Sequence, residues 1–429
     1  MKERITLPNL IVIVALISII FAASSGYAAE PAAERVWRSH GFWYERPVVE
    51  RLEPEQFPIL PWGWTPGDAK ALAEIKDCGF NLAGFVAPEH IELVEQAGLK
   101  AIINDPRMSQ KVNDLEISDA EIESRVASVV APFRGNKTVY GYYLWDEPTA
   151  HLFPALARWS AAIAKVDTDV QSYINLFPVG PPDFLNLLGG FSTYEEYVEA
   201  YVEQVKPRFI SYDNYSLMDD GSLRPQYFEN LEAIRKVSQR HGLPFWNIIL
   251  GNSHFHYASP TPGGLHFQVY TTLAYGGRGI SYFTYFSPLI GNFREAAVDQ
   301  FLNKTPTWDI IRNVNLQIHR LGPTYLKLKN INVFHHPDVP EGCLGIDSSK
   351  LLSVVEGGRF VVGEFQDPDG RPFVMVVNKD YKRSTPLNIR FKEEGRIMFT
   401  SAYTGEDRPW VGENNWLGPG QGMLMTLSK

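Results

Sequence analysis

Short hydrophobic runs alternate with stretches of helical spacing up to about residue 328. Apolar runs of about four to eight residues, bounded by turn signals, are typical of strands buried on both faces of a parallel sheet. The runs that we expect to form strands are residues 57–64, 80–86, 100–105, 140–148, 170–177, 208–215, 244–251 and 279–286. Their alternation with helical segments predicts an α/β protein with a (β/α)8 TIM barrel.

Helix-start signals follow several of these runs. Thr65, Pro66 and Asp68 predict a helix that Thr65 caps, and Ser118 with Glu121 forms the pattern of a capping box. An open doubly wound sheet is the alternative arrangement, but no glycine-rich nucleotide turn follows the first run. The barrel is therefore the preferred architecture.

The hydrophobic pattern changes after Leu328. Short apolar runs then follow one another, separated by turns such as residues 367–370, as in an antiparallel sheet. We therefore predict a (β/α)8 domain with an N-terminal lead-in at residues 29–328 and a C-terminal antiparallel β-sandwich domain at residues 329–429.

The first residues carry the features of a secretory signal. Lys2 and Arg4 precede the apolar run 10–22, which is followed by small residues up to Ala28. We expect residues 1–28 to be a signal peptide and the protein to be secreted, or held in the periplasm or cell envelope. The apolar run is short for a membrane span, so stable membrane insertion is not expected.

Composition narrows the possible partners. The chain has 429 residues, a net charge of -9 and no cluster of Lys and Arg, which argues against a nucleic-acid surface. Cys78 and Cys343 are the only cysteines and lie in different predicted domains; the sequence does not decide whether they pair. Neither lies near other metal-ligating residues, so we predict no metal and no cofactor. The oligomeric state stays open.

The run 140–148 ends in two carboxylic acids and a proline, Asp146, Glu147 and Pro148. In a parallel barrel, reacting groups lie where strands end and helices begin. A carboxyl group held there beside Trp145 and other aromatic residues loses water, which raises its pKa and keeps it protonated. Glu147 is therefore the candidate general acid, the alternative being an acid that only stabilises a helix start. Asp146 would orient the loop.

The stretch Trp145-Asp146-Glu147-Pro148 resembles the fourth-strand motif of clan A glycoside hydrolases, which include β-galactosidases, cellulases and mannanases. That motif is Asn-Glu-Pro or a close variant, so Asp146 stands where the clan has Asn. The resemblance implies a barrel hydrolase in which Glu147 is the acid/base. It also implies a nucleophilic Glu at the end of the seventh strand, but residues 246–256 contain no carboxylate.

Asp213, at the end of the sixth run, is the candidate for the second carboxyl group, as base or nucleophile. Its alternative role is to cap a loop. Separations of about 5 to 5.5 Å between the two carboxyls would fit a retaining mechanism, and about 6.5 to 9.5 Å an inverting one. A Tyr-Asp pair on this strand also resembles chitinase-type barrels, in which the acetamide of the substrate attacks. Weaker candidates for the base are Asp105, Glu89 and Glu295.

Polar and aromatic residues near the predicted strand ends are the candidates for sugar binding. They are Trp62, Trp64, Asn104, Trp145, Asp146, Asn175, Tyr212, Tyr215, Trp246, Asn252, His254, Tyr282 and Tyr285. The sequence thus predicts a secreted glycoside hydrolase that cleaves a poly- or oligosaccharide. One alternative is a carbohydrate-binding protein without turnover on the same scaffold, and another is a non-catalytic envelope component. The sugar, the linkage and the choice of exo or endo attack are not defined by the sequence.

Overall fold

The computed structural model describes residues 35–36, 44–45, 56–108, 115–411 and 415–428. The signal peptide predicted at residues 1–28 lies outside them. The chain divides into two units, Met1–Val48 and Val49–Lys429. In the first unit, strand β1 (Arg35–Val36) pairs antiparallel with β2 (Tyr44–Glu45).

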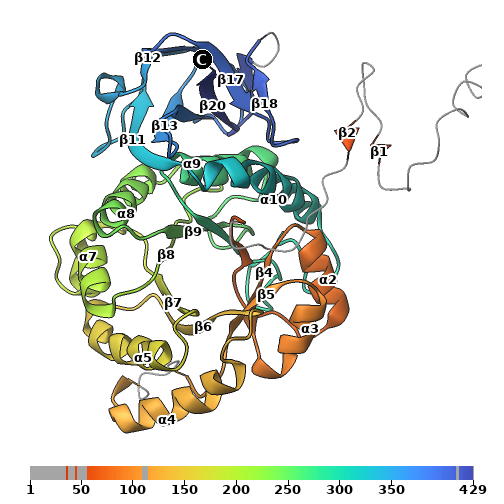
Figure 1. Cartoon of the computed structure of the whole chain (residues 1–429), viewed down its shortest axis with the longest axis vertical. Coiled ribbons are helices and arrows are strands. Elements are labelled where there is room, and N and C mark those ends of the chain that lie inside the picture. The colour runs from red at the N-terminus through yellow and green to blue at the C-terminus, as the bar shows by residue number, and fades with distance from the viewer. Residues whose placement is uncertain (1–34, 37–43, 46–55, 109–114, 412–414, 429) are drawn as a thin grey trace, which may run out of the picture. The chain divides into compact units, whose positions relative to one another are not determined.

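The second unit contains an eight-stranded parallel sheet that curls into a ring (Figure 1). Its strands are β3 (Ile59–Pro61), β4 (Leu82–Val86), β5 (Lys100–Ile103), β6 (Val139–Asp146), β7 (Gln171–Leu176), β8 (Ile210–Asp213), β9 (Phe245–Leu250) and β10 (Gly279–Phe283). Their order in the sheet runs from β3 through β10, β9, β8, β7, β6 and β5 to β4. The N–H of Phe85 donates to the carbonyl of Gly63 (2.8 Å), and the N–H of Thr65 donates to the carbonyl of Phe85 (3.2 Å). These two bonds join β4 to the end of β3 and close the barrel.

Helices surround the ring, as Figure 1 shows. They are α2 (Ala69–Asp77), α3 (Ile91–Gln96), α4 (Asp119–Val130), α5 (Phe153–Val166), α6 (Pro182–Leu188), α7 (Tyr194–Val205), α8 (Tyr227–His241), α9 (Pro262–Ala274) and α10 (Pro306–Tyr325). Helix α5 illustrates why they pack there, because Phe153, Leu156, Trp159 and Ile163 recur at helical spacing and are buried.

Two of the predicted helix starts can be compared with the structure. Ser118 caps α4 by accepting a hydrogen bond from the N–H of Glu121 (3.3 Å), as expected. Helix α2 differs, because Asp68 and not Thr65 is its cap and accepts from the N–H of Ala71 (2.8 Å). Asp and Thr are both good caps, so the first turn could begin at either position on sequence grounds.

The C-terminal domain is antiparallel. Its main sheet contains β11 (Lys329–His336), β13 (Phe360–Gln366), β14 (Pro372–Asn378), β20 (Gly422–Ser428), β17 (Arg396–Thr400) and β18 (Asp407–Pro409). Two short pairs accompany it, β12 (Leu352–Glu356) with β16 (Asn388–Phe391), and β15 (Thr385–Pro386) with β19 (Trp416–Leu417). A (β/α)8 barrel followed by a β-sandwich was predicted, and the structure confirms this fold class.

Helix α9 joins the two domains. It packs against β13, β14 and β20 as well as against β9 of the barrel. The contact is close, since a Cβ atom on Gly363 would lie 2.0 Å from the carbonyl oxygen of Ala274. The hydroxyl of Tyr275 also lies 2.9 Å from Nε2 of His335. Glycine is therefore required at residue 363 for the sheet to reach this helix.

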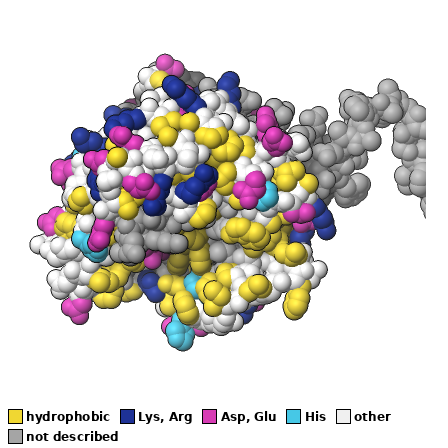
Figure 2. Space-filling view, turned by 90° about the horizontal axis from the view of Figure 1, so that it is seen from below, with side chains coloured by type: hydrophobic (Ala, Val, Ile, Leu, Met, Phe, Trp, Pro, Cys, Tyr) yellow, Lys and Arg dark blue, Asp and Glu magenta, His cyan; other side chains and the backbone are white. Residues whose placement is uncertain are grey.

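Cys78 and Cys343 are both free thiols, so they do not form a disulfide. No helix in the described part of the chain is long and apolar enough to cross a membrane. On the face that Figure 2 displays, basic and acidic side chains are interspersed among apolar ones.

Candidate active site

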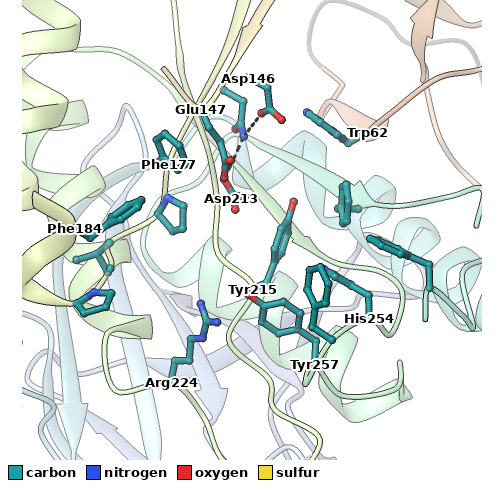
Figure 3. Close-up of a pocket in the computed structure, with 18 residues that line it drawn as sticks. Trp62, Asp146, Glu147, Phe177, Phe184, Asp213, Tyr215, Arg224, His254 and Tyr257 are labelled. Atoms are coloured by element: carbon teal, nitrogen blue, oxygen red, sulfur yellow. Dashed lines mark hydrogen bonds between the residues drawn. The ribbon is translucent and has the colours of Figure 1, made fainter. Parts of the chain in front are cut away.

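Three carboxyl groups meet at the C-terminal end of the barrel strands (Figure 3). Asp146 is the last residue of β6, Glu147 follows it, and Asp213 is the last residue of β8. All three line a cavity of about 420 Å³. The parallel strands explain this convergence, because their carboxyl ends open on the same rim of the barrel.

Asn175 on β7 lies between the acids and fixes two of them. Its Nδ2 donates to Asp146 (3.0 Å) and to Asp213 (3.2 Å), which are the dashed bonds of Figure 3. Its Oδ1 accepts from the hydroxyl of Ser211 (3.1 Å), which lies 3.0 Å from the hydroxyl of Tyr173. The Asn175 side chain is buried, so this chain of bonds holds the amide with its donors toward the carboxylates.

The backbone at Glu147 is unusual, with a φ of 51°. This left-handed conformation is costly for a residue with a side chain and persists where the surroundings enforce it. The N–H of Glu147 donates to the carbonyl of Asn175 (2.8 Å), and the hydroxyl of Tyr197 donates to the carbonyl of Pro148 (2.6 Å). These bonds direct the Glu147 side chain into the cavity.

The carboxyl groups of Glu147 and Asp213 point toward one another (Figure 3). They lie within hydrogen-bond reach, and this interaction acts to lower the pKa of Glu147. Burial raises the pKa of Glu147 to about 7, and the negative charge of Asp146 adds to the effect. Burial also raises the pKa of Asp213 well above its usual value, reinforced by the charges of Glu147 and Asp146. The pair therefore shares a proton near neutral pH, as two close carboxyls do when they cannot both ionise. Burial raises the pKa of Asp146 to about 6.

His254, in the loop after β9, is a neutral hydrogen-bond acceptor facing the same cavity. Burial lowers its pKa to about 4, and the charge of Arg294 adds to this. Asn252 donates through Nδ2 to Thr284 (2.9 Å), so its Oδ1 accepts from Nδ1 of His254 (2.8 Å). Nδ1 thus carries the proton, which leaves Nε2 as an acceptor suited to a sugar hydroxyl.

The rest of the cavity wall is mostly apolar. The lining residues that sequence reasoning missed are Phe177, Pro178, Val179, Gly180, Pro181, Phe184, Arg224, Phe255, Tyr257, Phe283 and Phe293. The Pro- and Gly-rich loop after the fifth predicted strand was visible in the sequence and was a signal for residues 177–181. Flat apolar faces of this kind suit the C–H faces of a sugar ring.

A second cavity of about 590 Å³ lies beside the first. Trp62 and Phe283 line both, and Trp64, Tyr285 and the loop after β10 complete the second. Trp64 is 67% exposed, so its ring is available to a ligand. Trp62, Asp146, Glu147, Asn175, Asp213, Tyr215 and His254 line the first cavity, whereas Trp64 and Tyr285 line the second.

Six of the residues predicted to bind sugar line neither cavity, namely Asn104, Trp145, Tyr212, Trp246, Asn252 and Tyr282. Tyr212 is buried in the outer core, because neighbours on a strand point to opposite faces and Asp213 takes the inner one. Tyr282 bonds to Asn315 of α10 (2.8 Å) in that core.

Trp246 is the second residue of β9 and therefore fills the barrel interior at the end opposite the carboxyl groups. Trp145 packs against the outer core, and Asn252 acts through His254. The three weaker candidates for the base, Asp105, Glu89 and Glu295, also lie outside both cavities. Asp105 is paired with Arg107 (2.6 Å).

Within the described ranges, no group of three or more His, Cys, Asp or Glu side chains is arranged to hold a metal ion.

Comparison with known proteins identifies the fold. No family model matches this sequence, and no curated protein matches it. A β-galactosidase from Bacillus circulans sp. alkalophilus matches with a TM-score of 0.61 over 87% of this chain and 99% of the enzyme, at 8% identity. A glycoside hydrolase family 5 protein from Bacteroides vulgatus ATCC 8482 matches with a TM-score of 0.54 over 87% of this chain and 89% of that one, at 12% identity.

A β-galactosidase from Marinomonas ef1 matches at 8% identity with a TM-score of 0.49 over 63% of this chain, which spans only 62% of that enzyme's length. Identities this low show a shared fold alone. The fold is the one that these two glycoside hydrolases share, and it agrees with the barrel that the resemblance in the sequence implied.

The raised pKa values predict that the acid pair destabilises the folded protein at neutral pH. The folded state keeps a proton on Glu147 up to about pH 7, whereas the unfolded chain releases it near pH 4.3, so stability falls as pH rises between these values. We expect Glu147→Gln to raise Tm at pH 7.5 by on the order of 2 °C, with the gain vanishing near pH 4. Differential scanning calorimetry of the exposed-site variant Glu295→Gln serves as the control. A lower Tm for Glu147→Gln at pH 7.5 would contradict the assignment.

Proposed function

We propose that the protein is an exported glycoside hydrolase, with Glu147 as the general acid and Asp213 as the second catalytic carboxyl group. The observation that carries the proposal is the buried, hydrogen-bonded Glu147–Asp213 pair in a cavity of about 420 Å³ at the rim of a (β/α)8 barrel. Export rests on the sequence features of residues 1–28 alone.

The roles follow from the environments of the two acids. Glu147 has a pKa of about 7, so it holds a proton for the leaving glycosidic oxygen at neutral pH. Burial raises the pKa of Asp213, but the Asn175 amide donates to this carboxyl group and so favours its ionised form. When a sugar separates the two groups, the proton goes with Glu147 and the charge stays with Asp213.

The direct contact between these carboxyl groups also bears on stereochemistry. An inverting enzyme holds its acids about 6.5 to 9.5 Å apart to admit a water, and a retaining enzyme about 5 to 5.5 Å. A hydrogen-bonded pair is closer to the second arrangement. We therefore propose that Asp213 attacks the anomeric carbon directly, and that it does so without the acid that clan A carries on the seventh strand.

The cavities support a saccharide substrate. The first has aromatic walls, with Tyr215 stacked on Phe283 at 5.2 Å, and a small number of polar side chains among them. The second continues past Trp62 to the exposed Trp64 ring. We propose that it receives the next sugar or the aglycone of a poly- or oligosaccharide.

Glu147→Gln tests the general acid through its dependence on the leaving group. Removing the proton donor should lower kcat/KM by about 10²- to 10³-fold for oligosaccharides, but much less for 2,4-dinitrophenyl glycosides, whose leaving group needs no proton. Initial rates over a panel of sugars would be measured with Glu295→Gln as the control, since this acid lies outside both cavities. An equal loss on both substrate types would exclude the role. If wild type binds a saccharide by calorimetry yet cleaves none, the carbohydrate-binding alternative holds instead.

The stereochemical proposal predicts retention. NMR of the first product formed from a cleaved glycoside should show the anomer of the substrate, and Asp213→Asn should abolish turnover while leaving ligand binding in place. Initial formation of the opposite anomer would show that Asp213 activates a water. Retention that persists at full rate in Asp213→Asn would point to attack by a group on the substrate.

Asp146→Asn tests the electrostatic tuning of the acid. The negative charge of Asp146 raises the pKa of Glu147, so its removal should lower that pKa. The basic limb of the kcat/KM profile, near pH 7 in wild type, should therefore move to lower pH in the variant. Asn at this position is the residue of the clan A motif, and it can keep a hydrogen bond with Asn175. A basic limb that does not move would mean that Glu147 does not govern it.

A further inference from the structure

One cationic side chain faces the three acids across the first cavity. Arg224 is the only Lys or Arg among the described residues that line it, and Figure 3 shows its guanidinium directed into the space on the side away from Glu147 and Asp213. Burial, reinforced by the neighbouring carboxylates, keeps the pKa values of both acids raised. The charge of Arg224 therefore does not serve to neutralise the acids.

The guanidinium of Arg224 has no acidic partner in the described part of the chain. It lies 5.0 Å from the centre of the Tyr257 ring and is hydrogen-bonded to the Tyr257 hydroxyl. The buried Arg235 differs, because it forms a bidentate ion pair with Glu232 at 2.8 and 2.6 Å. Arg224 thus keeps most of its five N–H donors available.

The backbone that carries Arg224 is held from both sides. Its N–H donates to the carbonyl of Ser216 (3.0 Å), which closes the loop between β8 and α8. At the tip of this loop, the carbonyl of Gly221 accepts from the hydroxyl of Tyr381 (2.8 Å) and from Nζ of Lys382 (3.1 Å). Both donors belong to the C-terminal domain. The C-terminal domain therefore helps to position Arg224 in the cavity wall. Because the loop is already held in place, a ligand that binds Arg224 loses little free energy to ordering the loop.

We propose that Arg224 binds an anionic substituent, a carboxylate or a sulfate ester, on the sugar that occupies the first cavity. The inference rests on the proposed function, because the anomeric carbon must lie at Glu147 and Asp213. A carboxylate at C5 or a sulfate on O6 then projects away from the acids, toward the guanidinium. The planar guanidinium pairs with both kinds of oxygen anion in bidentate geometry, and such charge-assisted bonds are strong. Without Arg224, a cavity that holds three acids would repel an anionic sugar.

The test compares matched 4-nitrophenyl glycosides of both anomers, namely the hexoside, its 6-sulfate and the corresponding uronide. Wild type should prefer an anionic member by at least tenfold in kcat/KM. Arg224→Gln should lose about 100-fold on that substrate and change less than threefold on the neutral hexoside, because only the anion contacts the guanidinium. Which anionic member is preferred distinguishes a carboxylate from a sulfate.

Two further measurements keep the inference separate from the proposed function. Arg294→Gln removes a nearby exposed charge outside the first cavity and should leave the preference intact. Calorimetry with the free uronic acid and the sugar 6-sulfate should show binding that Arg224→Gln abolishes, whether or not any glycoside is cleaved. Cleavage of neutral hexosides with no anionic preference would overturn the inference alone. Failure to cleave any glycoside, with Arg224-dependent binding of an anionic sugar, would overturn the hydrolase and keep the anion site.

Discussion

The site depends on two carboxyl groups held against one another with little water. Glu147 and Asp213 come from different strands, and their contact is possible because both strands end on one rim of a closed barrel. Close, partly desolvated acids are costly while both are charged, so the pair must share a proton or be separated by a ligand. The strained backbone at Glu147 adds to that cost. The surrounding bonds from Asn175 and Tyr197 hold an arrangement that an isolated loop would not keep.

This constraint explains why so much of the chain is required for a few polar atoms. The amide of Asn175 is oriented by Ser211 and Tyr173, and His254 is oriented by Asn252, so each group at the cavity surface has a fixed donor or acceptor role. The C-terminal domain also helps to position a cavity residue, because its residues 381–382 bind the loop that carries Arg224. Rigid support of this kind reduces the reorganisation that binding and catalysis would otherwise need.

The sequence predicted the barrel well because its strands are buried on both faces and appear as continuous apolar runs. Each of the eight expected runs overlaps a barrel strand. Helix α9 has no such local signal. It packs between the barrel and the C-terminal sheet, so nearly all of its residues are buried and no polar face reveals a helical period. Position within a strand was also invisible. Trp246 was predicted to lie at the rim, yet it is near the start of its strand and lies in the barrel interior.

The three acids of the site could be predicted from the sequence, but Arg224 on the opposite wall of the cavity could not. The reason lies in how each side chain is positioned. Asp146, Glu147 and Asp213 end buried strands, where a charge after an apolar run has few structural explanations. Arg224 belongs to a loop whose path is set by long-range bonds to residues 381–382, about 160 positions away. No local pattern records such a contact. Side chains at the ends of the barrel strands define where a reaction could occur, and side chains on the loops define which ligands the cavity accepts. Only the strand-end side chains can be predicted from strand periodicity.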